Sequence, residues 1–97
     1  MITYVAFYYS DDNINYSVGH VREIATDAVR GAKAQIFRNH TYEAVKEWVK
    51  DEACRQYNEN VEDPDEHLIR EDITLFGGTA TDNWHEVIGY FFIREFM

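Results

Sequence analysis

Both ends of the chain are dense in apolar, β-branched and aromatic residues, and this pattern predicts a strand at each end. Residues 2–9 are rich in β-branched and aromatic side chains, and large side chains fall on both faces of the segment. Residues 86–96 likewise place large apolar side chains on both faces. A strand that is apolar on both faces is typical of the interior of a sheet, so we expect residues 2–9 to be central.

Between these strands, residues 19–38 place apolar side chains at helical spacing, which predicts a helix. Gly31 interrupts the pattern, and a glycine in a helix interior costs about 1 kcal/mol relative to alanine. The alternative is a shorter helix followed by a strand at residues 34–38. The pattern leaves both arrangements open.

Residues 42–57 form the clearest helical pattern in the chain. Thr41 precedes them as a candidate N-cap, and Glu43 lies in the first turn, where the helix dipole favours a negative charge. The apolar stripe of this segment consists of Val45, Trp48, Val49, Ala53 and Tyr57.

Turn-forming and polar residues separate the remaining elements. Residues 58–66 contain the only proline and predict a loop. Residues 72–76 predict a strand that ends at two glycines, and residues 79–85 form a polar connection interrupted by Trp84. We expect the strands at residues 72–76 and 86–96 to form an antiparallel pair.

The resulting order, β-α-α-β-β, indicates an α+β domain. We expect two helices to cover one face of a three-stranded, largely antiparallel sheet. The chain has 97 residues, of which 45% are hydrophobic, so residues 1–97 are expected to form one domain with its own core.

Composition then excludes several classes of protein. The net charge of −9 argues against direct binding of nucleic acid, which requires a basic face. A single cysteine, Cys54, cannot form an internal disulfide. No apolar run approaches the roughly 20 residues that span a bilayer, and the N-terminal residues do not resemble a signal peptide. We therefore expect a cytoplasmic protein without a membrane interaction.

No catalytic motif is recognisable in the sequence. Cys54 lies in a predicted helix beside acidic residues, which raise a thiol pKa, and the four histidines are scattered. No lysine follows Gly77 and Gly78 at the spacing of a phosphate-binding loop. We expect a protein that is not an enzyme and that uses no cofactor or metal.

The negative charge is concentrated in one part of the chain. The first forty residues are neutral, whereas residues 51–72 contain nine acidic residues and two basic ones. Acidic runs usually only keep a surface solvated, and Lys46 and Lys50 are placed to pair with Glu43 and Glu47. The functional hypothesis is an acidic surface that occupies a basic groove. Acidic residues four positions apart recur about every 6 Å along a helix, a spacing that suits sites for DNA phosphates.

Tyrosines at element edges add candidate aromatic anchors for a protein interface, namely Tyr16 and Tyr42. The candidate partner-binding residues are Glu43, Glu47, Asp51, Glu52, Glu59, Glu62, Asp63, Asp65, Glu66 and Tyr42.

In size, charge and α+β build, the chain resembles small acidic inhibitors encoded by phages and mobile elements, including DNA-mimicking anti-CRISPR proteins. The residues that carry this likeness are Glu43, Glu47, Asp51, Glu52 and the segment 59–66, which contains no basic residue. The resemblance implies a non-catalytic inhibitor that binds the basic nucleic-acid-binding groove of a host nuclease or a CRISPR surveillance complex and blocks target DNA.

Two other functions remain open from the sequence. One is a small acidic interaction or accessory module without DNA mimicry, whose charge only keeps it soluble. The other is a small-ligand or cation binder that uses the oxygen-rich segment 62–67, although this segment lacks the glycine of an EF-hand loop.

Overall fold

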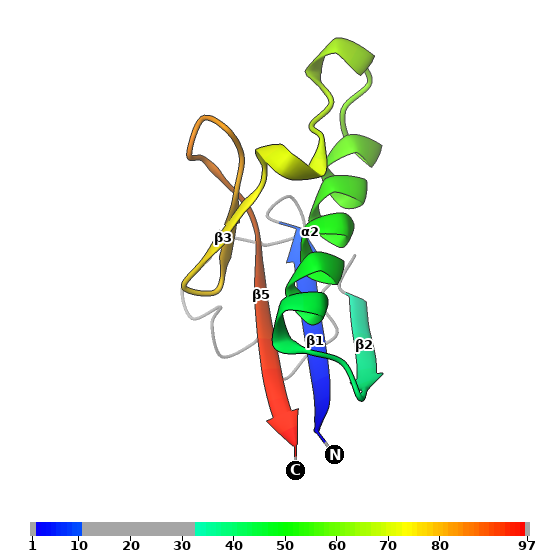
Figure 1. Cartoon of the computed structure of the whole chain (residues 1–97). Helices are drawn as coiled ribbons and strands as arrows, with labels where there is room; N and C mark the ends of the chain where they lie inside the picture. Colours follow the sequence, from blue (N-terminus) through cyan, green and yellow to red (C-terminus); the bar gives the residue numbers. More distant parts are fainter. Residues whose placement is uncertain (1, 11–32, 97) are drawn as a thin grey trace, which may run out of the picture.

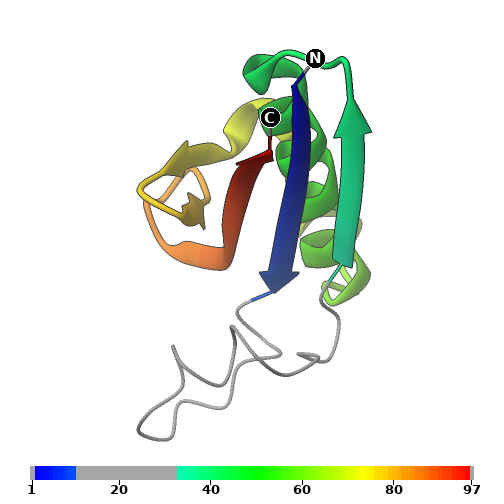
Figure 2. The same cartoon turned by 90° about the horizontal axis from the view of Figure 1, so that it is seen from below.

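The computed structural model describes residues 2–10 and 33–96, which form a five-stranded antiparallel sheet with one α-helix packed on it (Figure 1). The strand order is β2-β1-β5-β4-β3. Seen from below, β1 lies between β5 and β2, and helix α2 runs along one face of these strands (Figure 2). The strands are β1 (Thr3–Ser10), β2 (Lys33–Arg38), β3 (Thr74–Phe76), β4 (Thr79–Thr81) and β5 (Val87–Phe96).

Helix α2 (Tyr42–Glu59) confirms the clearest prediction from the sequence. Thr41 caps it as expected, because its hydroxyl oxygen accepts a hydrogen bond from the Ala44 N–H at 3.1 Å. The helix continues two residues beyond the predicted end, into the segment expected to be a loop. No helix in the described ranges has the length and apolar character needed to cross a membrane.

The predicted helix over residues 19–38 is wrong at its C-terminal end, where Lys33–Arg38 form β2. This strand pairs with β1 in antiparallel register, with Tyr4 opposite Phe37. The alternative of a strand at residues 34–38 is therefore the arrangement observed. Within β2 only Phe37 is buried, as expected for a short strand at the edge of the described sheet. The apolar spacing of this segment therefore fitted a helix only by chance. Residues 19–32 of the predicted helix, and Tyr16, lie outside the described residues.

The C-terminal part contains one more strand than the sequence predicted. The polar connection at residues 79–85 begins with β4, which pairs with β3 on one side and β5 on the other. The expected direct pairing of β3 with β5 is therefore wrong. Gly77 and Gly78 both have positive φ, 59° and 86°, which suits a two-residue hairpin turn between β3 and β4. This turn places β4 between β3 and β5.

The fold is thus α+β, as predicted, but its described part has five strands and one α-helix instead of three strands and two helices. Two short 3₁₀ helices, η2 (Pro64–Glu66) and η3 (Arg70–Asp72), connect α2 to β3.

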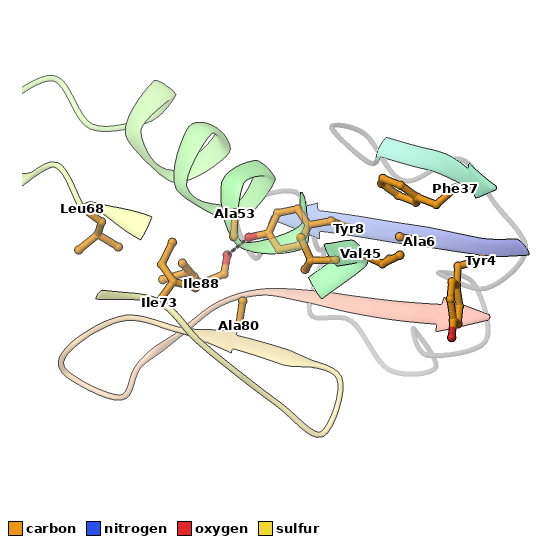
Figure 3. Packing of buried hydrophobic residues seen from close by; sticks show 11 residues of the cluster. Tyr4, Ala6, Tyr8, Phe37, Val45, Ala53, Leu68, Ile73, Ala80 and Ile88 are labelled. Atoms are coloured by element: carbon orange, nitrogen blue, oxygen red, sulfur yellow. Dashed lines mark hydrogen bonds between the residues drawn. The ribbon is translucent and has the colours of Figure 1, made fainter. Parts of the chain in front are cut away.

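The core lies between α2 and the sheet face beneath it. Alternate residues of β1 point toward the helix, where they pack against the apolar stripe predicted from the sequence (Figure 3). Gly89 of β5 lies directly under the ring of Tyr8, and a Cβ atom there would clash with the Tyr8 hydroxyl oxygen and approach its Cζ to 2.5 Å. The buried residues of this core cluster are Tyr4, Ala6, Tyr8, Phe37, Val45, Val49, Ala53, Leu68, Ile73, Ala80 and Ile88.

Candidate functional site

Beyond the C-terminal end of α2, residues 60–67 extend past the sheet as a narrow excursion of the chain (Figure 1). We call this segment the acidic tip. Its base is closed by Asn58, whose side-chain amide donates to the Leu68 carbonyl at 2.9 Å and accepts from the Leu68 N–H at 2.8 Å. Leu68 is buried, so this clamp joins the tip to the core.

Short-range hydrogen bonds shape the acidic tip itself. The Asp63 carboxylate accepts from the Asp65 N–H at 3.0 Å and caps η2, with Pro64 at the first helical position. Nε2 of His67 lies 2.8 Å from the Val61 carbonyl oxygen, across the base of the tip. The sequence predicted a loop here, and the structure shows that a 3₁₀ turn gives the loop a defined shape.

The tip carries four of the candidate partner-binding residues, and all four are exposed. Within the described part of the chain, none of the four forms an ion pair. Their charge therefore remains uncompensated by neighbouring side chains. These residues are Glu62, Asp63, Asp65 and Glu66.

The helical candidates are placed differently, because basic side chains neutralise most of them. Arg70 of η3 pairs with both Glu47 and Asp51, at 2.9 Å from its Nε to Asp51 Oδ1. The predicted pairing of Glu43 with Lys46 is present only at 4.0 Å, and the partner of Glu47 is Arg70 rather than Lys50.

Arg55 neutralises the remaining two acids of α2, Glu52 and Glu59. Glu52 is only 6% exposed and also accepts a hydrogen bond from Gln56 at 3.1 Å. Burial by itself raises the pKa of Glu52, but the hydrogen bonds from Arg55 and Gln56, together with the positive charges of Arg55 and Lys33, outweigh burial and leave the pKa below its ordinary value. Glu52 is therefore a buried, ionised part of the fold, inaccessible to a partner.

Tyr42 is exposed at the start of α2, as the sequence predicted. Its ring packs edge-on against Tyr4, with ring centroids 5.8 Å apart, and lies 5.9 Å from the Lys46 ammonium. It lies at the opposite end of α2 from the acidic tip, so the structure does not bring the two together.

A cleft of about 460 Å³ opens between the acidic tip and the loop that joins β4 to β5. We call it the tip cleft. Its walls combine carboxylates with two aromatic rings, from segments far apart in the sequence. The residues that give it this character are Asp65, Glu66, Asp72, Asp82, Tyr57 and Trp84.

Asp82 organises the wall of the tip cleft that faces the tip. Its Oδ1 accepts from the N–H groups of Trp84 at 2.8 Å and Glu86 at 2.9 Å, and its own N–H donates to the Glu86 carbonyl. His85 completes this turn with a positive φ of 62°. The turn holds Trp84 outward, where the residue is 79% exposed.

Cys54 lies in α2 near the base of the tip and is half-buried, as a structural cysteine would be. Its Sγ donates to the Leu68 carbonyl at 3.2 Å. Burial raises the pKa of this thiol, and the negative charges of Asp51, Asp72 and Glu71 raise it further. A thiol that stays protonated is a poor nucleophile, and here it contributes to the clamp at Leu68.

The carboxylates do not converge on a point where a metal ion would sit. In the segments that the structure describes, no group of three or more His, Cys, Asp or Glu side chains is arranged to hold one. The oxygen-rich segment 62–67 thus provides exposed acids spread over a surface.

Reasoning from the sequence found the acids of the tip but missed the other wall of the cleft. Trp84 was visible as an apolar residue in a polar connection, which was the available signal. Asp72 and Asp82 gave no signal, because their approach to the tip depends on the course of β3 and β4.

Comparison with known proteins adds no relative: no protein-family model, curated protein or solved structure matches this chain.

Proposed function

We propose that this protein is a non-enzymatic inhibitor that docks its acidic tip into a basic, nucleic-acid-binding groove of another protein and thereby excludes DNA. The observation that carries the proposal is the absence of ion pairs at the four tip acids, in the described part of a chain whose helical acids are nearly all paired. Unpaired carboxylates on a projecting segment attract basic partners over a distance of about 8–10 Å at physiological salt.

The proposal narrows the surface that the sequence suggested. Because Arg70 and Arg55 already neutralise the acids in the middle and last turns of α2, the series along the helix does not present a continuous row of free charges. The tip acids take the place of DNA phosphates, and Glu43 is an exposed outlier near Tyr42. The proposed partner remains a host nuclease or a CRISPR surveillance complex.

The test begins by finding a partner that duplex DNA releases. Host proteins retained on the immobilised chain are eluted with duplex DNA and identified. Binding of labelled DNA by the purified partner is then measured with and without this protein, at low and at physiological salt. We expect the protein to compete with DNA and to compete better at low salt.

Two double charge-reversal variants distinguish an effect of the tip on competition from an effect of net charge. E62K/E66K and E43K/E95K change the net charge equally, and all four positions are exposed. We expect E62K/E66K to abolish competition and E43K/E95K to retain it. Equal loss in both variants would show that only net charge matters, and full competition by E62K/E66K would exclude the tip.

A specific observation also favours the second candidate function, an interaction module without DNA mimicry. Phe76 at the end of β3 is 81% exposed and lines one pocket with the exposed rings of Tyr42 and Phe92. Contiguous exposed apolar side chains are typical of surfaces that bind protein partners. This function predicts a partner that high salt does not release and that F76S releases.

A further inference from the structure

The tip cleft places carboxylates that have no ion pair among the described residues beside the exposed indole of Trp84. We propose that this cleft receives an arginine side chain of the partner, whose guanidinium the carboxylates bind and the indole of Trp84 stacks against. The inference rests on the proposed function and names the group on the partner that would be recognised.

Charge complementarity is the first argument. Among the described residues, no ion pair involves Asp65, Glu66, Asp72 or Asp82, so a cation entering the cleft displaces no basic side chain. Hydrogen bonds between a cation and a carboxylate are roughly twice as strong as neutral ones. The cleft therefore favours a cationic occupant.

The state of Asp82 is a second, independent argument. This carboxylate is only 6% exposed, yet it lines the cleft, and only its Oδ1 is engaged by backbone N–H groups. Its Oδ2 has no partner in the described part of the chain. This oxygen is accessible from the cleft, and a guanidinium offers five N–H groups that can donate to it.

The exposed ring of Trp84 favours a guanidinium over an ammonium. The Asp82 turn holds the indole outward, and an exposed tryptophan face attracts cations more strongly than the face of any other aromatic side chain. A planar guanidinium stacks on a ring while donating at its edge, whereas an ammonium acts as a compact point charge. Tryptophan and arginine are also the residues that most often dominate binding energy at interfaces.

Size excludes a bare metal ion as the natural occupant. The cleft volume is about 460 Å³, and its carboxylates are not grouped closely enough to coordinate one ion within the described residues. A side chain that carries several donors spans such a distribution of oxygens.

The test uses the isolated full chain and a small probe, blocked arginine (N-acetyl-arginine N-methylamide), followed by NMR. We expect titration to shift the indole N–H of Trp84 and the backbone amide of Asn83, with a dissociation constant on the order of 1–10 mM for a single cation in an open cleft. Trp48 is the internal reference, because its ring packs against Phe37 on the core side of α2. Its indole signal should not move.

Two further probes and a matched pair of variants make the test specific. Blocked citrulline has nearly the same shape as blocked arginine without its charge, and blocked lysine has the charge without the plane. We expect no shift with citrulline and a weaker response to lysine. E66Q should weaken arginine binding about two- to fivefold, while E62Q, outside the cleft, should leave it unchanged.

The inference would be overturned by no shift at Trp84, by equal responses to arginine and citrulline, or by equal effects of E66Q and E62Q. An equal response to lysine would remove the assignment to arginine. The experiment needs no DNA-binding partner, so its failure leaves the competition assay intact. Conversely, arginine binding without competition would refute the proposed function and keep the cleft as a cation site.

Discussion

Glu52 is a charged residue that is buried in the folded protein. It occupies a position on α2 between the apolar residues that pack on the sheet, and it is bound by Arg55 and Gln56. Ionised buried groups persist only when they are paired, because desolvation penalises the charged form. Glu52 therefore links the helix surface to the core, whereas the sequence had grouped it with the partner-binding acids.

We expect E52Q to destabilise the protein at neutral pH by about 1–3 kcal/mol, because the neutral amide cannot replace a carboxylate bound by a guanidinium. The folded-state pKa of Glu52 lies below its ordinary value of 4.5. This stabilisation is therefore fully present above the unfolded-state pKa and is lost as the pH falls through the folded-state pKa. Urea unfolding at pH 7 and at acidic pH measures both effects.

E43Q is the matched control, because Glu43 lies on the same helix and its side chain is 78% exposed. We expect E43Q to change the free energy of unfolding by less than about 0.5 kcal/mol. If E52Q were equally stable at pH 7, or if its deficit persisted unchanged in acid, the ionised state of Glu52 would not support the fold.

At the scale of elements, the acidic tip depends on one side chain at the end of α2. The Asn58 amide satisfies both backbone groups of Leu68, and Cys54 donates to the same carbonyl. The tip is thus attached to the helix by polar contacts and to the core by the buried Leu68.

We expect N58A to cost about 1–3 kcal/mol, because it leaves the N–H of a buried residue without its partner. Hydrogen exchange should accelerate at Leu68 and within η2, while exchange in β1 changes only with global stability. N60A provides the control, because Asn60 is exposed and its side chain donates to the Gln56 carbonyl at the end of α2, away from Leu68. Similar exchange at Leu68 in N58A and wild type would argue against the clamp.

Elements with a strong local signal were predictable from the sequence. Thr41 and the stripe that follows it fixed the start of α2, and dense β-branched and aromatic residues marked β1 and β5. Strand β4 was missed, and β2 was only the alternative to a longer helix, because both strands are short and become strands only by pairing with β1, β3 and β5. Pairing partners are set by tertiary structure and leave little trace in a local pattern.

The same limit applied to the candidate site. The tip acids stood out as a run without basic residues, but the sequence could not show which acids were neutralised by Arg70 and Arg55. Arg70 is 23 residues from Glu47, so their contact depends on the path through the tip and η3. The tip cleft was unpredictable for the same reason.

At the scale of the whole molecule, the negative charge is divided into two classes. Acids along α2 act as ion-pair partners, whereas those of the tip and its cleft have no ion pair among the described residues. Neutralising acids of the two classes should therefore have opposite consequences for stability.

We expect E62Q/E66Q to leave stability unchanged or to raise it slightly, because it removes like-charge repulsion without breaking an ion pair. R70Q should lower stability by about 0.5–1 kcal/mol, because it leaves Glu47 and Asp51 unpaired. Thermal unfolding at low and high salt should show that the R70Q deficit shrinks as salt screens the charges. A destabilised E62Q/E66Q would mean that the tip acids stabilise the fold.

The Asn58 clamp also has a consequence for how this surface can diversify. Its two hydrogen bonds fix the chain at both ends of the excursion, and among the described residues, residues 62–66 form hydrogen bonds only within the tip. Doubling the length of such a loop costs only about 0.6 kcal/mol in closure entropy. Insertions, deletions or grafted sequences between the two anchors would therefore reshape the proposed binding surface while the scaffold stays the same.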